Sequence, residues 1–289
     1  MPELPEVEVV KRSLNNKVKN SIIKSVKVND GKLRYKIDKN QIKDIIGLRL
    51  QKISRRSKFL LFFFSKDIVM LVHLGMTGKF FFINQKNTKY KTSFYYDIDE
   101  EKDKKHDRVV FSLSRGQKII YNDVRKFGFI KTVNSKKLSK NLHLKFLGPE
   151  PLSNNFNLNY FKERILKRKR KIKDLLMDQK FVSGLGNIYV NEVLYFSKVN
   201  PSKNIFKISL HEVKNIIKFT KIVLKKSIKE GGSSIKNFEN SDGKVGKYQQ
   251  KFKVYNRANQ SCKRVKCKSF IRRVIISNRS TFFCPDCQK

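Results

Sequence analysis

The 289-residue sequence is poor in acidic residues and lacks any apolar segment long enough to cross a membrane. It has 24 Asp and Glu residues against 66 Lys and Arg, so the formal net charge is +42. No apolar run approaches the roughly 20 residues that a transmembrane helix needs. A signal peptide would begin with a basic segment and an apolar stretch, whereas this chain begins with Glu3, Glu6 and Glu8. These absences predict a soluble intracellular protein that has no membrane partner.

The excess of lysine and arginine suggests a polyanionic partner, and nucleic acid is the simplest one. The alternative is a drift in composition, because Lys, Asn, Ile and Phe are abundant along the whole chain, including segments with no evident function. The charge alone therefore does not decide between a DNA-binding protein and a chain of biased composition.

Cysteine is rare, and all four cysteines fall near the end of the sequence. Four residues separate Cys262 from Cys267, and two separate Cys284 from Cys287. In a reducing compartment such a cluster favours metal binding over disulfides. Four thiolates suit one tetrahedral zinc ion and leave no open position for a reacting water, which predicts a structural site. The alternative is four unrelated buried cysteines. The segment between the pairs contains three arginines, Arg272, Arg273 and Arg279.

The first half of the chain has the pattern of one helix followed by many short strands. Apolar residues recur at helical spacing from Val7 to Leu14, which predicts a helix from about Pro5 to Asn16. Short apolar, aromatic and β-branched runs follow from Leu48 to Val133 and favour a β-sandwich or barrel. The predicted strands are Leu48–Ile53, Phe59–Phe64, Ile68–Leu74, Lys79–Ile83, Val109–Leu113, Lys118–Tyr121 and Phe129–Val133. The polar, lysine-rich stretch Asn84–Asp107 is predicted to be a long mobile loop.

Helical patterns follow the Gly-Pro-Glu-Pro sequence at 148–151. Ser209 and Glu212 have the spacing of a capping box, and the apolar residues after them predict one amphipathic helix that extends to Ile228. The glycine pair at 231–232 is expected to end this helix. The tail from about Gln250 carries the cysteines and strand-like runs.

Three short motifs suggest contacts with DNA, and each has a plainer alternative. Glycines at 184 and 186 precede Asn187 and a helical pattern, so backbone N–H groups there could bind a phosphate; a simple turn is the alternative. The segments 73–78 and 123–128 place Met76, Arg125 and Phe127 beside glycines at strand ends. Such residues can wedge a base step and replace an extruded base. In isolation, Met76 and Phe127 would more often be core residues and Arg125 a solvated charge. The four histidines show no ligand spacing and are interpreted as structural.

The order of these motifs resembles one family, the formamidopyrimidine-DNA glycosylases, which are bacterial base-excision enzymes for 8-oxoguanine and ring-opened purines. The resemblance runs nearly end to end and rests on MPELPEVE, RRSKFL, HLGMTG, DVRKFG, LGPEPL, DQKFVSGLGNIYVNEVL and the cysteine finger. It implies an α+β, multidomain fold. A β-sandwich with a leading helix would span residues 1–135, a helical domain with a helix–two-turns–helix element 136–237, and a lesion loop with a β-hairpin zinc finger 238–289.

The resemblance also implies the activity and the partners. The protein would be a bifunctional DNA glycosylase and abasic-site lyase that acts as a monomer on double-stranded DNA with oxidised bases. It would contain one structural zinc ion and no catalytic metal, and it would work in the bacterial cytoplasm.

By the same resemblance, Pro2 is the nucleophile once Met1 has been removed, and Glu3 is its acid/base partner, with Glu6 in support. Lys58 belongs to the catalytic group and contacts a DNA phosphate near the lesion. A second set of residues binds DNA. Met76, Arg125 and Phe127 would fill the gap left by the flipped nucleotide, Asn187 and Arg279 would bind flanking phosphates, and Lys244 would lie in the loop over the extruded base.

The chemistry of an N-terminal proline supports this role for Pro2. An α-amine has a pKa of ~8 and a lysine side chain a pKa of ~10.4. At neutral pH the unprotonated fraction is therefore on the order of a hundredfold larger for the terminal amine than for a lysine. Attack of this secondary amine on C1′ of the sugar expels the base and yields an iminium ion. The iminium acidifies the C2′ hydrogen, which permits β- and then δ-elimination, and the Glu3 carboxylate can move the protons.

The sequence departs from the family pattern in two places. Four residues separate the first two cysteines where the family usually has two, and Val245 replaces a proline common in the lesion loop. These changes bear on the fit of the finger to DNA and on lesion preference rather than on catalysis. Two alternatives remain. One is an endonuclease VIII-like enzyme for oxidised pyrimidines, which Leu4 disfavours. The other is a decayed zinc-finger DNA-binding protein, which the presence of Pro2 and Glu3 disfavours.

Overall fold

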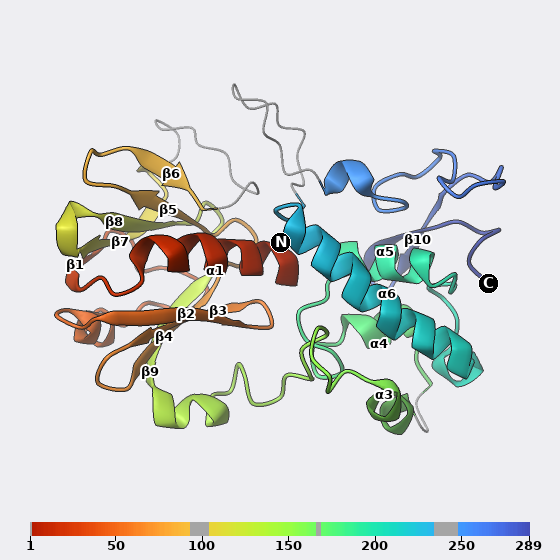
Figure 1. The fold of residues 1–289 in the computed structure, drawn as a ribbon, viewed down its shortest axis with the longest axis horizontal. Coiled ribbons are helices and arrows are strands. Elements are labelled where there is room, and N and C mark those ends of the chain that lie inside the picture. Colours follow the sequence, from red (N-terminus) through yellow and green to blue (C-terminus); the bar gives the residue numbers. More distant parts are fainter. Residues whose placement is uncertain (1, 93–103, 166–168, 234–247) are drawn as a thin grey trace. The chain divides into compact units, whose positions relative to one another are not determined.

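The computed structural model describes residues 2–92, 104–165, 169–233 and 248–289. It divides into two compact units. The first consists of Met1–Lys145 and Glu230–Lys247, and the second of Phe146–Lys229 and Tyr248–Lys289. Figure 1 shows the two sheets around α1 in the first unit and the helices of the second. The bounds of the three domains predicted from the sequence remain a prediction.

The first unit contains a helix and two antiparallel sheets, as the sequence predicts. Helix α1 (Leu4–Val18) precedes a five-stranded sheet of order β1-β7-β8-β5-β6 and a four-stranded sheet of order β2-β3-β4-β9. The strands are β1 (Ile23–Val28), β2 (Leu50–Arg56), β3 (Phe59–Phe64), β4 (Ile68–His73), β5 (Lys79–Ile83), β6 (Lys89–Lys91), β7 (Asp107–Leu113), β8 (Lys118–Asn122) and β9 (Phe129–Asn134). Short 3-10 turns lie at Gln41–Ile45, Ser114–Gly116 and Ser135–Lys140.

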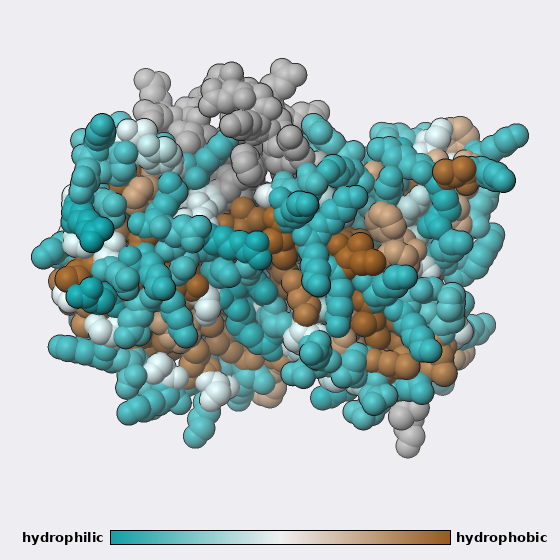
Figure 2. Space-filling view, in the orientation of Figure 1, coloured by the Kyte–Doolittle hydropathy of each residue, from teal (hydrophilic) through white to brown (hydrophobic). Residues whose placement is uncertain are grey.

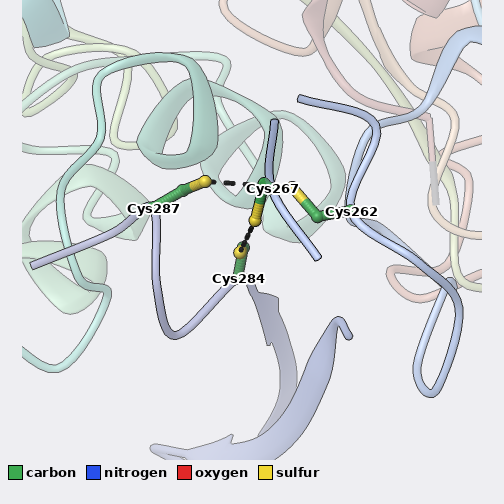
Figure 3. A group of neighbouring side chains, drawn as sticks. All are labelled: Cys262, Cys267, Cys284 and Cys287. Atoms are coloured by element: carbon green, nitrogen blue, oxygen red, sulfur yellow. Dashed lines mark hydrogen bonds between the residues drawn. The ribbon is translucent and has the colours of Figure 1, made fainter. Parts of the chain in front are cut away.

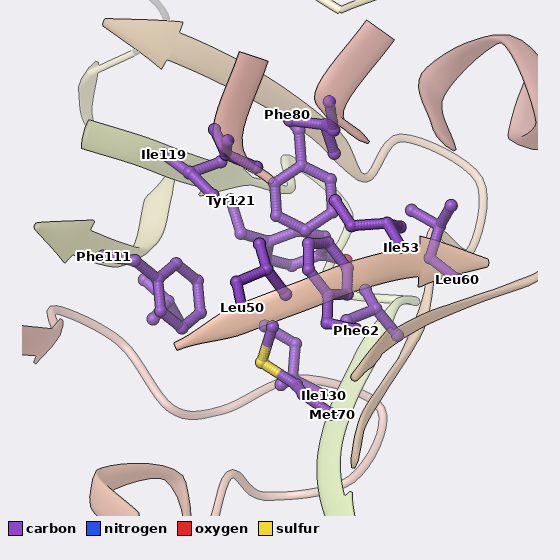
Figure 4. Close-up of a cluster of buried hydrophobic side chains, with 14 of the residues drawn as sticks. Leu50, Ile53, Leu60, Phe62, Met70, Phe80, Phe111, Ile119, Tyr121 and Ile130 are labelled. Carbon is purple, nitrogen blue, oxygen red and sulfur yellow. The ribbon is translucent and has the colours of Figure 1, made fainter. Parts of the chain in front are cut away.

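One hydrophobic core joins the two sheets and α1. Figure 4 shows aromatic side chains from both sheets in this core, where the ring centroids of Phe62 and Phe80 lie 5.6 Å apart and those of Phe80 and Tyr121 5.2 Å apart. Helix α1 adds apolar residues at helical spacing, from Val7 to Leu14. A smaller cluster on the other face of the four-stranded sheet includes Phe129. The four-stranded sheet is therefore packed against apolar residues on both of its faces.

The predicted loop at Asn84–Asp107 is wrong for part of its length. Strand β6 pairs with β5 there, with Tyr90 opposite Phe82, and Asp107 already belongs to β7. The ammonium groups of Lys17 and Lys89 lie over aromatic rings of this edge, 4.5 Å from the Tyr90 centroid and 4.1 Å from the Phe81 centroid respectively. Lysines are typical of an edge strand, which they protect from pairing with other chains. The lysines of β6 give this segment the composition of a loop, which is why the sequence does not indicate a strand there.

The second unit is helical and ends in a β-hairpin. Its helices are α3 (Leu158–Ile165), α4 (Ile172–Met177), α5 (Asn187–Phe196) and α6 (Leu210–Lys229), and its strands are β10 (Arg272–Ile276) and β11 (Arg279–Phe283). Short 3-10 turns lie at Ile205–Lys207 and Gln249–Lys251. The capping box of α6 is confirmed, since Ser209 N–H donates to Glu212 Oε2 at 2.8 Å and Glu212 N–H donates to Ser209 Oγ at 3.2 Å.

Hydrophilic side chains cover much of the molecular face in Figure 2. None of the described helices is both long and apolar enough to cross a membrane.

Candidate active site

Pro2 and Glu3 lie at the start of α1, and Glu6 holds them there. Glu3 is the N-cap residue of the helix, and its backbone N–H donates to Glu6 Oε2 at 2.9 Å. Pro2 is buried, as are the side chains of Glu3 and Glu6. The structure therefore brings together the three residues that the sequence assigns to the reactive centre, with a carboxylate on the residue next to the proline.

Glu6 also binds the segment that follows α6. Its Oε1 accepts hydrogen bonds from the Ser233 N–H at 2.7 Å and the Ser233 Oγ at 2.9 Å. Gly232 before it has φ +84°, and a Cβ on this glycine would lie 3.1 Å from Glu6 Oε1. Only glycine adopts that conformation freely and leaves room for the carboxylate. The sequence indicated that the glycine pair ends α6, but it did not reveal this contact with the reactive centre.

Lys58 lies in the two-residue turn between β2 and β3, and only 6% of its surface is exposed. Its neighbour Ser57 has φ +55°, a left-handed conformation that costs a serine energy. Burial lowers the pKa of His73 to about 4, with further lowering by the positive charge of Lys58. His73 is thus neutral at pH 7; its Nδ1 accepts the Gly75 N–H at 3.0 Å, and its ring stacks on Phe129. These contacts agree with the structural role predicted for this histidine.

Met76, Arg125 and Phe127 occupy two loops of the first unit, between β4 and β5 and between β8 and β9. Met76 is 37% exposed and Phe127 is 44% exposed, so neither is a core residue. The Arg125 guanidinium lies over the Phe127 ring, 4.7 Å from its centroid. An exposed methionine and phenylalanine beside a cation have the character of side chains that insert into a base stack.

Thr77 and Asp123 join these two loops. The Thr77 hydroxyl donates to Asp123 Oδ1 at 2.6 Å and accepts the Arg125 N–H at 2.9 Å. Asp123 is completely buried, and its Oδ2 accepts the Gly128 N–H at 2.9 Å. Asp123 therefore fixes the backbone on both sides of Phe127, directly at Gly128 and through the Thr77 hydroxyl at Arg125.

Two glycines let the loops approach each other. A Cβ on Gly75 would lie 2.4 Å from Gly128 N, and Gly75 has φ +61°. A Cβ on Gly128 would lie 1.8 Å from the Tyr121 hydroxyl oxygen. Real Cβ atoms do not approach so closely, so the glycines of both sequence motifs are required by packing.

Asn187 and Arg279 are brought together in the second unit. Asn187 begins α5 after Gly186, and its Nδ2 donates to the Ser280 carbonyl at 2.9 Å, next to the exposed Arg279. Sequence reasoning missed Lys173, whose Nζ donates to Thr281 Oγ1 at 2.6 Å and which is only 1% exposed. The one indication in the sequence that Lys173 is buried is its position among the apolar residues of α4. Burial lowers the pKa of Lys173 to about 8.

The four cysteines converge as their spacing predicts (Figure 3). Their Sγ atoms all lie within 4.8 Å of one another, with Cys262 and Cys287 at 3.9 Å and Cys267 and Cys284 at 3.7 Å. A tetrahedral zinc with Zn–S bonds of about 2.3 Å would hold its sulfurs about 3.8 Å apart. These distances fit a shared metal ion and exceed the roughly 2.05 Å of a disulfide. The four-residue spacing of the first pair is thus compatible with one metal site.

The second cysteine pair is anchored by Gln288, which is completely buried. Its Oε1 accepts the Cys284 N–H and its Nε2 donates to the Val199 carbonyl, each at 2.9 Å. The predicted lesion-loop residue Lys244 lies outside the described residues.

The fold and this arrangement are those of a DNA glycosylase. One family model, the formamidopyrimidine-DNA glycosylase N-terminal domain, matches residues 1–130, and a second, the formamidopyrimidine-DNA glycosylase H2TH domain, matches residues 147–239. The chain therefore belongs to the formamidopyrimidine-DNA glycosylase family. These matches confirm the resemblance inferred from the sequence and favour the purine-repair branch over the endonuclease VIII-like alternative.

Curated relatives and solved structures agree with this assignment. The chain is 40% identical to the formamidopyrimidine-DNA glycosylase of Rickettsia bellii and 35% identical to that of Bradyrhizobium sp., with full coverage of all three chains. Its fold matches Lactococcus lactis Fpg in complex with DNA containing an abasic site, at a TM-score of 0.84, 31% identity and 99% coverage of each chain. It also matches a variant of that protein in complex with DNA containing Fapy-dG, at a TM-score of 0.84, 32% identity and 100% coverage of each chain.

Proposed function

We propose that this protein excises oxidised purines, namely 8-oxoguanine and formamidopyrimidines, from duplex DNA and then cuts the strand at the abasic site. The observation that carries the proposal is the pairing of Pro2 with Glu3 at the start of α1, held by Glu6. A proline amine released from Met1 is a nucleophile with free base at neutral pH. An adjacent buried carboxylate is suited to proton transfer.

Each step of the proposed reaction uses a named group. The Pro2 nitrogen attacks C1′ as the bond from C1′ to the base breaks, and the proton that this nitrogen loses goes to the departing base. The nitrogen lone pair then opens the sugar ring: the C1′–O4′ bond breaks, O4′ takes up a proton from Glu3, and C1′ and nitrogen form the iminium. The resulting iminium draws electrons from C2′, so loss of a C2′ proton expels the 3′ phosphate, and a second elimination expels the 5′ phosphate. Glu3 carries protons between the sugar and the leaving groups. Lys58 binds a phosphate next to the damaged nucleotide.

The exposed loops supply the contacts that keep the damaged nucleotide outside the duplex. Met76 and Phe127 enter the base stack, and Arg125 faces the cytosine left without a partner. Stacking on Phe127 orients the Arg125 guanidinium. In the second unit Asn187 and Arg279 bind the flanking phosphates, and Lys244, outside the described residues, is a further DNA-binding residue in this proposal.

The cysteine cluster binds one zinc ion in this proposal. Zinc bound by four thiolates has no open coordination position, so this ion stabilises the hairpin that carries Arg279 and takes no part in the chemistry. The protein works as a monomer on the chromosome in the bacterial cytoplasm, in keeping with its bacterial relatives.

Trapping with borohydride tests the catalytic proposal. Borohydride reduces the iminium to a stable amine, so wild-type protein should form a covalent adduct with an 8-oxoguanine:C duplex. Pro2→Gly should bind the same duplex and form far less adduct. A thymine-glycol duplex provides the comparison for lesion choice, and preferential cleavage of that duplex would reverse the assignment to purines. Failure of wild-type protein to form any adduct while it binds the duplex would refute the proposed chemistry.

The zinc proposal has its own measurement. Elemental analysis of purified protein should find one zinc per chain, and Cys267→Ser should lower this occupancy and weaken DNA binding. Retention of DNA affinity in metal-free protein would contradict a structural role for the ion.

A further inference from the structure

Glu8, on helix α1, has a specific set of charged partners. It is only 7% exposed, and it binds three cations through two different oxygens. Its Oε1 accepts from Lys11 at 2.7 Å and from Arg12 at 2.8 Å, both on α1. Its Oε2 accepts from Arg55 Nε at 3.0 Å, on strand β2.

Arg55 connects this carboxylate to the turn that carries Lys58. While its Nε binds Glu8, its NH1 donates to the Ser57 carbonyl at 2.9 Å. Ser57 has φ +55°, and a serine in this conformation is held by its surroundings rather than by its own preference. The guanidinium therefore spans from a helix to the backbone of a strained turn.

The ion pair is well placed to fix this geometry. The side chains of Glu8 and Arg55 are each 10% exposed, so water screens their attraction less than it screens a surface pair. Burial raises the pKa of Glu8, but hydrogen bonds from Lys11, Arg12 and Arg55 outweigh that effect and hold it below its usual value. Glu8 is therefore ionised at neutral pH. A guanidinium that binds through two nitrogens also has a defined orientation.

The same helix carries the reactive proline at its start, and the same turn carries Lys58. From this arrangement we infer that Glu8, acting through Arg55 and the Ser57 carbonyl, is a positioning residue that sets where Lys58 lies relative to Pro2 and Glu3. This inference rests on the proposed function for the roles of Pro2 and Lys58. Glu8 and Arg55 need not touch DNA, because they act through the turn.

The chain offers a matched pair of variants for the test. Arg55→Gln removes the cation on Oε2 that reaches the turn, and Arg12→Gln removes a cation on Oε1 that does not. Both remove one positive charge from the same carboxylate. Glu8→Gln removes the negative charge that binds both Arg12 and Arg55, and Glu8→Asp keeps that charge on a shorter side chain.

The first measurement is the labelling rate of Lys58 by an amine-reactive ester, followed by peptide mass spectrometry on the full chain. Lys173 is an internal reference, since it is a buried lysine of the second unit. In Arg55→Gln and Glu8→Gln, labelling of Lys58 should rise severalfold relative to Lys173, and Arg12→Gln should match wild type. Unchanged labelling of Lys58, or an equal rise at Lys173, would overturn the inference.

The second measurement is the single-turnover rate of excision from an 8-oxoguanine:C duplex. A displacement of about 1 Å can cost up to about a hundredfold in rate, so Arg55→Gln and Glu8→Gln should lose about tenfold or more. Glu8→Asp should recover part of this loss, and Arg12→Gln should stay near wild type. Equal losses in Arg12→Gln and Arg55→Gln would overturn the positioning role. If wild type itself formed no adduct, the proposed function would fail instead, and the labelling result would still report on the turn.

Discussion

Glu6 and Ser233 lie 227 positions apart in the sequence, yet two hydrogen bonds to one carboxylate oxygen join them. The other oxygen of Glu6 accepts the backbone N–H of Glu3. Both oxygens of this buried side chain are therefore acceptors, and each one fixes a segment beside the proposed nucleophile. The charge pattern of the helix start does not reveal this arrangement.

Glu6→Gln should weaken both the fold and the reaction. In either orientation of the amide, its NH₂ group would face a donor, either Glu3 N–H or the donors of Ser233. An unsatisfied buried donor costs about 1–3 kcal/mol, and this should appear as a lower free energy of unfolding in urea. The rate of borohydride trapping should fall as well. Ser233→Ala is the control, because it keeps the backbone N–H bond and should cost only about 1 kcal/mol; an equal loss in both variants would argue against the double role of Glu6.

Truncation of Phe127 should mainly slow excision and truncation of Phe129 should mainly lower stability, although only one residue separates them. Phe129 is 4% exposed, so Phe129→Ala should cost about 3–5 kcal/mol in unfolding free energy. Phe127 is 44% exposed, so Phe127→Ala should change stability by no more than about 1 kcal/mol and mainly slow excision. Urea denaturation and single-turnover assays separate these effects. A stable Phe127→Ala protein with wild-type excision would exclude Phe127 from the base-stack contact.

Thr77 should contribute to the preference of the enzyme for the base opposite the lesion. Thr77→Val removes both the donor to Asp123 and the acceptor of the Arg125 N–H, so the loop that presents Arg125 should loosen. We expect a loss of about 1–3 kcal/mol in stability and less preference for cytosine opposite 8-oxoguanine. Thr77→Ser keeps the hydroxyl and should restore both properties. Excision assays with each of the four opposite bases measure the preference, and an unchanged preference in Thr77→Val would count against the link.

His73 should make the protein less stable in mild acid. Its folded pKa is about 4, below the ordinary value of 6.5, so the unfolded chain binds the proton more readily. The contribution of neutral His73 to stability is complete above pH 6.5 and is lost as the pH falls toward 4. His73→Asn can still accept the Gly75 N–H and does not titrate in this range. Urea denaturation at pH 7 and pH 5 should therefore show a smaller difference for His73→Asn than for wild type, and an equal difference would contradict a buried neutral histidine.

Much of the fold follows from local patterns in the sequence. The predicted strands at 59–64 and 79–83 coincide with β3 and β5, because aromatic runs between turn residues are distinctive. The sequence does not predict strand β1, since its alternating lysines hide a half-buried strand, and it predicts a loop where β6 lies. Each of these two strands is recognisable only from the partner strand beside it.

The candidate site was predictable in its residues but not in its connections. The cysteines stand out by their spacing, and the resemblance to the glycosylase family implies the roles of Pro2 and Glu3. The contacts from Glu6 to Ser233, Glu8 to Arg55 and Lys173 to Thr281 join segments distant in the sequence, and no local pattern specifies them. Met76 and Phe127 show the same limit, because an apolar residue beside a glycine fits a core as well as an exposed loop.

The most direct test of the central claim is to locate the bond in the borohydride-trapped adduct. Wild-type protein is trapped on an 8-oxoguanine duplex, the complex is digested with protease and nuclease, and the modified peptide is sequenced by mass spectrometry. Our account predicts that Met1 is absent and that the sugar remnant is attached to the nitrogen of Pro2. Attachment to a lysine side chain, or an adduct formed while Met1 is retained, would contradict it.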